Sequence, residues 1–219
     1  MKHINFLFVA SVAFVLSDCL SAASGEIGDF ALLDHEGHFH QLRKYADSRA
    51  LVLISMASDC AENVEKFSKY RSLRDKWERK GITFLAIDSS SKDALNEVRI
   101  MASASSLGLP ILLDDSQLVA ESLGITKAGQ IIVLAPSRRQ LLYRGGLDVD
   151  ALSINSETAS SALADTLLKA ISGDLDVFEE AVETAVEGWD LDFPSLSAHS
   201  THAPDFASDV VPILKEKCV

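Results

Sequence analysis

The stretch from Leu51 to Arg79 reads LVLISMASDCAENVEKFSKYRSLRDKWER and predicts a buried strand, a tight turn and an amphipathic helix. Residues 51–57 are mostly apolar and have polar neighbours, which is typical of a central strand in a parallel sheet. Asp59 is the expected N-cap of the helix, and Glu62 completes a capping box. Apolar residues then recur every three or four positions, which gives the helix over 61–79 one apolar face. These residues are Val64, Phe67, Tyr70, Leu73 and Trp77.

Cys60 is expected in the first turn of that helix. Unpaired backbone N–H groups and the positive end of the helix dipole favour a thiolate there, which is the nucleophilic form of cysteine. The carboxylates of Asp59 and Glu62 oppose the thiolate. Two interpretations of Cys60 therefore stay open, a reactive thiol and a small structural or vestigial side chain.

Length, composition and charge limit the class of protein. The chain has 219 residues, which is enough for one well-buried domain with extensions. Its hydrophobic fraction of 47% indicates a globular protein. A formal net charge of −12 argues against nucleic acid and anionic membrane surfaces as partners.

Residues 1–24 are typical of a secretory signal peptide. After a weakly basic start, Ile4–Leu16 is mostly apolar, and 21–23 (Ser-Ala-Ala) offers a cleavage site. The apolar run is short for a membrane span, so we expect no stable span after cleavage. We expect a periplasmic or secreted protein, with a lipid anchor through Cys19 as the alternative. In that oxidising compartment the mature chain would carry two cysteines.

The first segments after the signal predict a β-hairpin. Residues 29–34 and 39–42 are the two strands, and the Gly-containing turn between them is polar. His35, His38 and His40 lie here, and a metal site is conceivable because two of them flank one turn. The chain offers no cysteine or carboxylate pattern with ligand spacing, so we expect a solvated hairpin tip and no metal.

The rest of the chain alternates apolar strands with amphipathic helices. We expect strands over 82–88, 109–115, 130–135 and 141–146, and helices over 92–105, 117–123 and 159–171. This order predicts an α/β fold with a mixed sheet and helices on both faces. The central strands should be 51–56, 82–87 and 131–134.

This order of segments resembles the thioredoxin-like superfamily, in the redoxin branch of alkyl hydroperoxide reductase and thiol-specific antioxidant proteins. The resemblance covers residues 27–171. It is carried by 28–34, 51–60, 82–88, 109–115, 123–126 with 130–134, and Tyr143-Arg144-Gly145-Gly146. It implies a thioredoxin-like fold over 25–172, with a central mixed sheet flanked by helices and an N-terminal hairpin. It also implies thiol oxidoreductase or antioxidant activity through Cys60. The partner would be a thiol reductant or a redox partner protein, and we expect no cofactor in this chain.

The chain departs from the family at several positions. Asn63 replaces the resolving cysteine of the active loop. Leu53 and Ala57 replace the proline and the hydroxyl residue of the peroxiredoxin frame. Gly129 stands where the family has a cis-proline, so we expect a trans bond there, a looser loop and weak or absent general disulfide exchange. Trp189 stands where many relatives have a late cysteine. The alternatives to an enzyme are a catalytically degenerate docking module and a secreted binding protein.

Residues 173–204 change in character. No lysine or arginine occurs between Ala170 and Leu214, and acidic residues are frequent. We expect an acidic linker over 173–204 that packs poorly, with a docking site for a basic partner as the alternative.

The end of the chain, 205–219, resembles the opening helix of a bacterial c-type cytochrome domain. In that family Cys218 would begin the haem-attachment motif Cys-x-x-Cys-His, which a longer chain would complete. The resemblance implies haem c in a longer parent protein, of the kind in which redoxin domains are fused to cytochrome c and copper monooxygenase modules. An amphipathic tail with an accidental cysteine is the alternative.

Overall fold

A six-stranded mixed sheet forms the centre of the protein. The computed structural model describes residues 27–57, 64–90, 95–147, 161–193 and 211. The order of strands in the sheet is β5-β4-β3-β6-β7-β8. Their bounds are β3 Ala50–Met56, β4 Ile82–Asp88, β5 Ile111–Leu113, β6 Ile131–Ala135, β7 Gln140–Gly145 and β8 Val182–Glu183. Strands β3, β4 and β5 run parallel, β6 is antiparallel to both of its neighbours, and β8 is parallel to β7. The predicted central strands are therefore confirmed.

Strand β3 is buried along its whole length because both faces of the sheet are covered. It pairs with β4 on one side and with β6 on the other. Alternate side chains point to opposite faces, as strand geometry requires. Val52, Ile54 and Met56 join one hydrophobic cluster, and Leu51 and Leu53 join the other.

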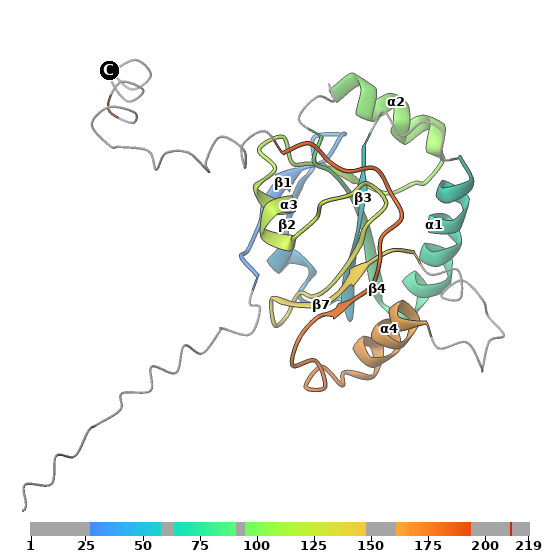
Figure 1. Cartoon of the computed structure of the whole chain (residues 1–219), viewed down its shortest axis with the longest axis vertical. Helices are drawn as coiled ribbons and strands as arrows, with labels where there is room; N and C mark the ends of the chain where they lie inside the picture. The colour runs from blue at the N-terminus through green and yellow to red at the C-terminus, as the bar shows by residue number, and fades with distance from the viewer. Residues whose placement is uncertain (1–26, 58–63, 91–94, 148–160, 194–210, 212–219) are drawn as a thin grey trace, which may run out of the picture.

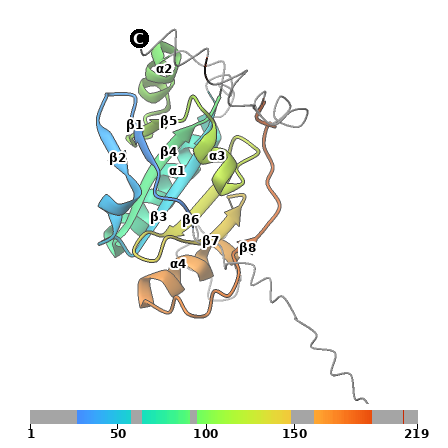
Figure 2. The same cartoon turned by 90° about the vertical axis from the view of Figure 1, so that its left-hand side faces the viewer.

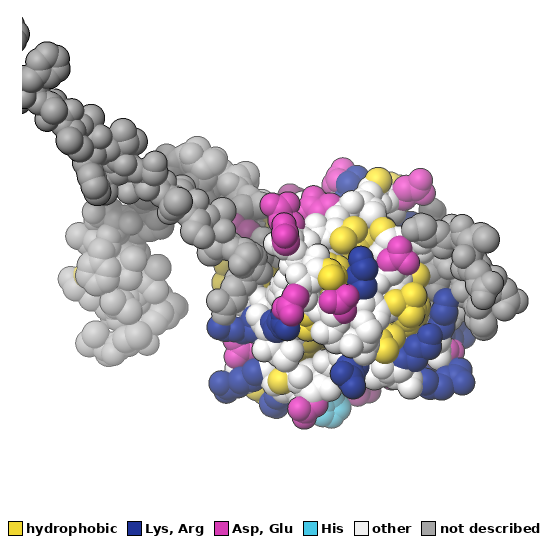
Figure 3. Space-filling view, turned by 90° about the horizontal axis from the view of Figure 1, so that it is seen from below, with side chains coloured by type: hydrophobic (Ala, Val, Ile, Leu, Met, Phe, Trp, Pro, Cys, Tyr) yellow, Lys and Arg dark blue, Asp and Glu magenta, His cyan; other side chains and the backbone are white. Residues whose placement is uncertain are grey.

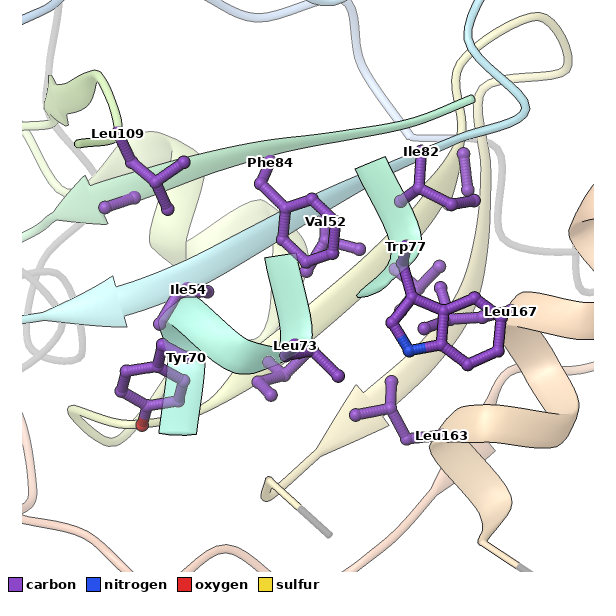
Figure 4. Close-up of a cluster of buried hydrophobic side chains, with 14 of the residues drawn as sticks. Val52, Ile54, Tyr70, Leu73, Trp77, Ile82, Phe84, Leu109, Leu163 and Leu167 are labelled. Carbon is purple, nitrogen blue, oxygen red and sulfur yellow. The ribbon is translucent and has the colours of Figure 1, made fainter. Parts of the chain in front are cut away.

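Three helices cover one face of the sheet (Figure 1). They are α1 (Val64–Trp77), α2 (Leu95–Ser105) and α4 (Ala162–Ser172), and the 3-10 turn η2 (Glu78–Lys80) continues α1. Figure 4 shows Tyr70, Leu73 and Trp77 of α1 packed over the sheet residues Val52 and Phe84. The spacing of the apolar residues in α1 follows directly from this contact.

The opposite face is covered by smaller elements. The hairpin of β1 (Ala31–Leu33) and β2 (Phe39–Gln41), the 3-10 turn η1 (Leu42–Tyr45) and α3 (Leu118–Leu123) lie there (Figure 2). Asp114 caps α3, because its carboxylate accepts hydrogen bonds from the N–H groups of Val119 (3.3 Å) and Ala120 (2.8 Å). Burial raises the pKa of the Asp114 carboxyl, although these hydrogen bonds oppose the shift. The predicted hairpin and the predicted helices on both faces are confirmed.

The expectation that residues after α4 pack poorly is wrong for 174–193, which follow the edge of the sheet (Figure 2). Leu175 and Phe178 are buried, and β8 extends the sheet beside β7. Acidic side chains stay at the surface, where Asp176 pairs with Arg138. Two apolar residues of this acidic stretch, Leu175 and Phe178, are buried in the core, and a strand forms where a linker was expected. Residues 194–210 and 212–219, including Cys218, lie outside the described part of the chain.

Charges of both signs share the surface despite the net charge of −12. On the face seen in Figure 3, basic and acidic side chains alternate with small hydrophobic areas. Within the described ranges, no helix combines the length and the apolar character needed to span a membrane.

Candidate functional site

The two described ends of the chain around Cys60 meet at one place in the fold. Cys60 and the other residues of 58–63 lie outside the described residues. Ala57, just after β3, and Lys66, in the first turns of α1, line the same small notch. The predicted strand and helix around Cys60 are confirmed, while its place in the first helical turn and its exposure stay predictions.

The notch is a cavity of about 20 Å³ at the end of β3. Its lining is Ser55, Met56, Ala57, Lys66, Phe67, Tyr70, Ala128 and Gly129. The hydroxyl oxygen of Ser55 is buried, and no described residue offers it a hydrogen-bond partner. The notch therefore combines apolar walls with a polar atom, and its volume has room for about one water molecule.

Gly129 lies at the notch with a trans peptide bond, since no described residue has a cis bond. This confirms the prediction for the position that holds cis-proline in the family. Its φ of +89° suits glycine, and its N–H donates a 2.7 Å hydrogen bond to the carbonyl oxygen of Ser55. The loop has its own support, because the side chain of Gln130 accepts from the N–H of Thr126 (2.9 Å) and donates to the carbonyl of Gly124 (3.1 Å). The hydrogen bonds of Gly129 and Gln130 hold this loop, which does not support the expectation of a looser loop.

A larger groove opens beside the notch between α1 and the segment after β8. Its volume is about 500 Å³, within the range of ligand pockets. The lining residues are Lys66, Lys69, Tyr70, Gly129, Tyr143, Gly146, Leu147, Thr184, Ala185 and Glu187. Two lysines and one glutamate add charged groups to a groove whose lining is more apolar than polar. A small molecule with an apolar body and a polar or anionic end fits this chemistry.

The segment after β8 brings Trp189 to the same loop. Its carbonyl oxygen accepts a 2.9 Å hydrogen bond from the N–H of Ala128, next to Gly129. The indole side chain is exposed, with 64% of its residue surface accessible. The backbone of Trp189, at the position where many relatives have a late cysteine, therefore lies beside the candidate site.

The histidines of the hairpin form a separate group around Asp34. Oδ1 of Asp34 accepts hydrogen bonds from the N–H groups of Glu36 and His38, both 2.9 Å, and Oδ2 lies 2.9 Å from Nε2 of His40. The other ring nitrogen of His40 is hydrogen-bonded to the hydroxyl of Tyr45. Burial alone would raise the pKa of the Asp34 carboxyl, but the hydrogen bonds from His40, His38 and Glu36 outweigh it and lower the pKa to about 2.

Three potential metal ligands of this group, Asp34, Glu36 and His38, lie within 4.8 Å of one another. Both carboxylate oxygens of Asp34 already accept hydrogen bonds within the turn. Glu36 and His38 are exposed, as expected for a solvated hairpin tip. The turn itself accounts for the arrangement, and no metal role is assigned to it.

Sequence reasoning missed several residues of the site. Tyr70 was placed on the apolar face of its helix, but its hydroxyl also donates a 3.3 Å hydrogen bond to the carbonyl of Gly129. Nothing in the sequence around Ser55, Lys66 and Lys69 marks these residues as part of a site. The groove wall of 184–187 lies in an acidic stretch whose composition predicts a linker, so its sequence carries no sign of this wall.

The comparisons agree on the fold. The model of the AhpC/TSA family matches residues 24–164, well over half of the chain. No curated protein matches the sequence. A hypothetical protein from Sinorhizobium meliloti 1021 is similar in structure, with 20% identity and a TM-score of 0.61 over 78% of this chain and 94% of that one.

Two further solved structures are also similar. An uncharacterized conserved protein from Geobacillus kaustophilus has 17% identity and a TM-score of 0.56, over 77% of this chain and 90% of that chain. A candidate thiol:disulfide interchange protein DsbE from Chlorobium tepidum has 17% identity and a TM-score of 0.54, over 68% and 96%. These likenesses show a shared thioredoxin-like fold.

Proposed function

This chain belongs to the AhpC/TSA family, and on that premise we propose that it is a thiol-based oxidoreductase whose single catalytic cysteine is Cys60. The observation that carries the proposal is the convergence of Ala57 and Lys66, on either side of Cys60 in sequence, on one notch beside Gly129. The notch shares Lys66, Tyr70 and Gly129 with the groove of about 500 Å³. In the proposed reaction, a substrate held in this groove reacts with the Cys60 thiol.

The proposed reaction is thiol–disulfide exchange. The Cys60 thiolate attacks one sulfur of a disulfide, forms a mixed disulfide, and releases the other sulfur as a thiolate. Asn63 cannot complete the cycle, so a second thiol, from a small reductant or a redox partner protein, attacks the mixed disulfide and frees Cys60. With a peroxide, the thiolate would instead take one oxygen to give a sulfenic acid and release the other as an alcohol or water. Ala57 offers no hydroxyl to orient a peroxide, which makes disulfide exchange the favoured reaction.

The test compares Cys60→Ser with Cys218→Ser, which removes the other cysteine of the mature chain. Mixed-disulfide formation with bis(2-hydroxyethyl) disulfide is followed by mass spectrometry, and the rate of alkylation by iodoacetamide is measured at pH 7. We expect Cys60→Ser to abolish the adduct at that position and Cys218→Ser to retain it. We also expect Cys60 to alkylate faster than free cysteine. Equal turnover by the wild type and Cys60→Ser would rule out the mechanism.

The second candidate function is a docking module that has lost catalysis. The replacement of three family positions by Asn63, Ala57 and Gly129 favours it. In this case Cys60 would alkylate no faster than free cysteine, and no mixed disulfide would accumulate. The same two measurements therefore separate the two functions.

We further propose export and a longer parent protein. Residues 1–24 would direct the chain to the periplasm or the exterior, which N-terminal sequencing of the exported protein tests. Cys218 would supply one haem thioether if codons after Val219 encode the rest of Cys-x-x-Cys-His. Co-expression of such an extended chain with a haem-attachment system should then yield a c-type absorption spectrum. A stop codon directly after Val219 would contradict the haem proposal and make Cys218 a candidate partner for Cys60.

A further inference from the structure

Residues 184–193, named here the C-terminal strap, pair with the loop that leads into β6. The N–H of Ala128 donates to the carbonyl of Trp189 (2.9 Å), and the N–H of Leu191 donates to the carbonyl of Thr126 (2.8 Å). These two bonds form an antiparallel bridge centred on Lys127 and Asp190. The strap therefore occupies the backbone groups of 126–128 that would otherwise be open to an added strand.

The strap is anchored on both sides of this bridge. The side chain of Gln117, which is buried, donates a 2.7 Å hydrogen bond to the carbonyl of Asp192. Leu191 and Phe193 pack against the hydrophobic cluster under α3. At the other end the hydroxyl of Thr184 is 2.7 Å from that of Tyr143. Buried contacts hold the strap, so its position does not depend on the exposed Lys127–Asp190 ion pair.

The contact between strap and loop is too close for an intervening chain. A Cβ added to Gly188 would lie 1.9 Å from the carbonyl oxygen of Ala128 and 3.2 Å from its carbonyl carbon. Both are backbone atoms, which cannot move aside as a flexible side chain would. The loop can therefore take an extended polypeptide only if the strap leaves.

The groove lies on the other side of the strap. Thr184, Ala185 and Glu187 form one of its walls, and Lys66 and Lys69 of α1 stand on the other. Nζ of Lys66 reaches the strap, where it donates a 3.5 Å hydrogen bond to the carbonyl oxygen of Glu187. Its volume of about 500 Å³ suits a molecule of low molecular weight. The same segment thus blocks one way of binding and shapes another.

We propose that the C-terminal strap sets the substrate class of the candidate site. Low-molecular-weight disulfides bind in the groove. Extended protein chains cannot bind beside it, because the strap already pairs with the backbone of 126–128. This inference rests on the proposed function of Cys60. In the reaction, the Cys60 thiolate attacks one sulfur of the small disulfide, and the other sulfur leaves as a small thiolate.

The first test compares two substrates with the full mature chain. Single-turnover rates of mixed-disulfide formation are measured with bis(2-hydroxyethyl) disulfide and with insulin. We expect the wild type to prefer the small disulfide by at least tenfold after correction for the rates of free cysteine. Gly188→Ala, which pushes the strap away from Ala128, should raise the insulin rate about tenfold. The small-disulfide rate should not rise with it, because the strap also forms one wall of the groove. Gly28→Ala is the matched control, because its added Cβ meets no atom within 4 Å, and it should change neither rate.

The second test does not need an active thiol. In a Cys60→Ser background, hydrogen exchange should find the amides of Ala128 and Leu191 protected, and Gly188→Ala should remove that protection. Fluorescence anisotropy should then detect binding of fluorescein-labelled, carboxymethylated insulin B chain to the Gly188→Ala protein and none to its parent. If Gly188→Ala fails to fold, Leu191→Pro serves instead, since it removes the donor to Thr126.

The outcomes separate the two proposals. Loss of amide protection without any gain in peptide binding or insulin rate would overturn the role of the strap. Insulin and the small disulfide reacting equally fast in the wild type would also overturn it. If neither disulfide reacts with the wild type but the peptide binds only when the strap is displaced, the role of Cys60 fails and the strap's exclusion of extended chains stands.

Discussion

The hydroxyl of Tyr70 donates a hydrogen bond to the carbonyl oxygen of Gly129 over 3.3 Å, which joins α1 to the loop before β6. Both residues line the notch beside the Cys60 segment. The side chain of Tyr70 therefore connects α1, the helix that follows Cys60 in the sequence, to the loop in which Gly129 stands at the cis-proline position of the family. Tyr70 keeps the spacing of the notch by this bond and by its buried ring.

Tyr70→Phe should lower the free energy of unfolding by about 0.5–1 kcal/mol, because it removes the 3.3 Å hydrogen bond to Gly129 and keeps the ring. Tyr143→Phe is the comparison. Its hydroxyl is 2.8 Å from the carbonyl of Gly146 and 2.7 Å from the hydroxyl of Thr184. Its loss should cost about 1–3 kcal/mol. Urea denaturation measures both, and an equal cost for the two variants would contradict the ranking.

Gly129→Pro should destabilise the protein by about 3 kcal/mol or more, although proline is the family residue at this position. Proline cannot adopt the φ of +89°, and it removes the N–H that bonds to the Ser55 carbonyl. Gly129→Ala is the control, because it meets the same unfavourable φ and keeps the donor. Urea denaturation should find the alanine variant destabilised, but less than the proline variant. A proline variant as stable as the wild type would show that the loop adapts to proline.

Stability should fall at acid pH through Asp34. The pKa of its carboxyl is about 2 in the folded protein and 3.8 without the fold. Because the pKa of Asp34 is lower in the folded protein, its carboxylate stabilises the fold at pH values above the unfolded-state pKa. This stabilisation is lost as the pH falls from about 4 to about 2. The shift corresponds to roughly 2 kcal/mol. The unfolding free energy of Asp34→Asn, measured in urea between pH 6 and pH 2, should lack this component, and identical pH profiles of variant and wild type would refute it.

The two tryptophans should report separately on the core and on the C-terminal strap. Trp77 is 1% exposed and Trp189 is 64% exposed. Acrylamide should quench the red-shifted emission of Trp189, and Trp189→Phe should leave a blue-shifted emission that resists quenching. That variant should change stability by less than about 0.5 kcal/mol, whereas Trp77→Ala should cost about 3–5 kcal/mol. Strong quenching of the remaining emission in Trp189→Phe would contradict the burial of Trp77.

Much of the fold could be predicted from local patterns. The continuous apolar run of 51–57 indicates a strand covered on both faces, and β3 is such a strand. The three- and four-residue spacing of apolar residues in α1 indicates one buried face, and Phe67, Leu73 and Trp77 bury it. Burial of apolar surface is the largest favourable term in folding. Because strands and helices bury residues at different spacings, the spacing of apolar residues in the sequence indicates which element forms.

The candidate site could be predicted only in part. A glycine in place of cis-proline predicted the trans bond before Gly129, because only proline makes a cis bond common. The contacts of Asp34 depend on residues that chain direction and sheet register bring together. The same is true of the buried hydroxyl of Ser55, for which no described residue is a hydrogen-bond partner. Polar contacts of this kind leave no periodic trace in a sequence.

The sequence alone was sufficient to predict the order of strands and helices and the family of the domain. It also identified Ala57, Asn63 and Gly129 as departures from the family's site residues. Each of these conclusions depends on residue type at a given position. Only the tertiary structure decided the path of residues 174–193. Their acidic composition predicts solvation, but Leu175, Phe178 and Leu191 find hydrophobic surface that exists only once the sheet has formed. Their backbone then bonds to β7, which makes β8 the edge strand of the sheet, and to the loop at Ala128. A strand at a sheet edge is stabilised by its neighbour more than by its own sequence, and that neighbour is present only in the folded protein.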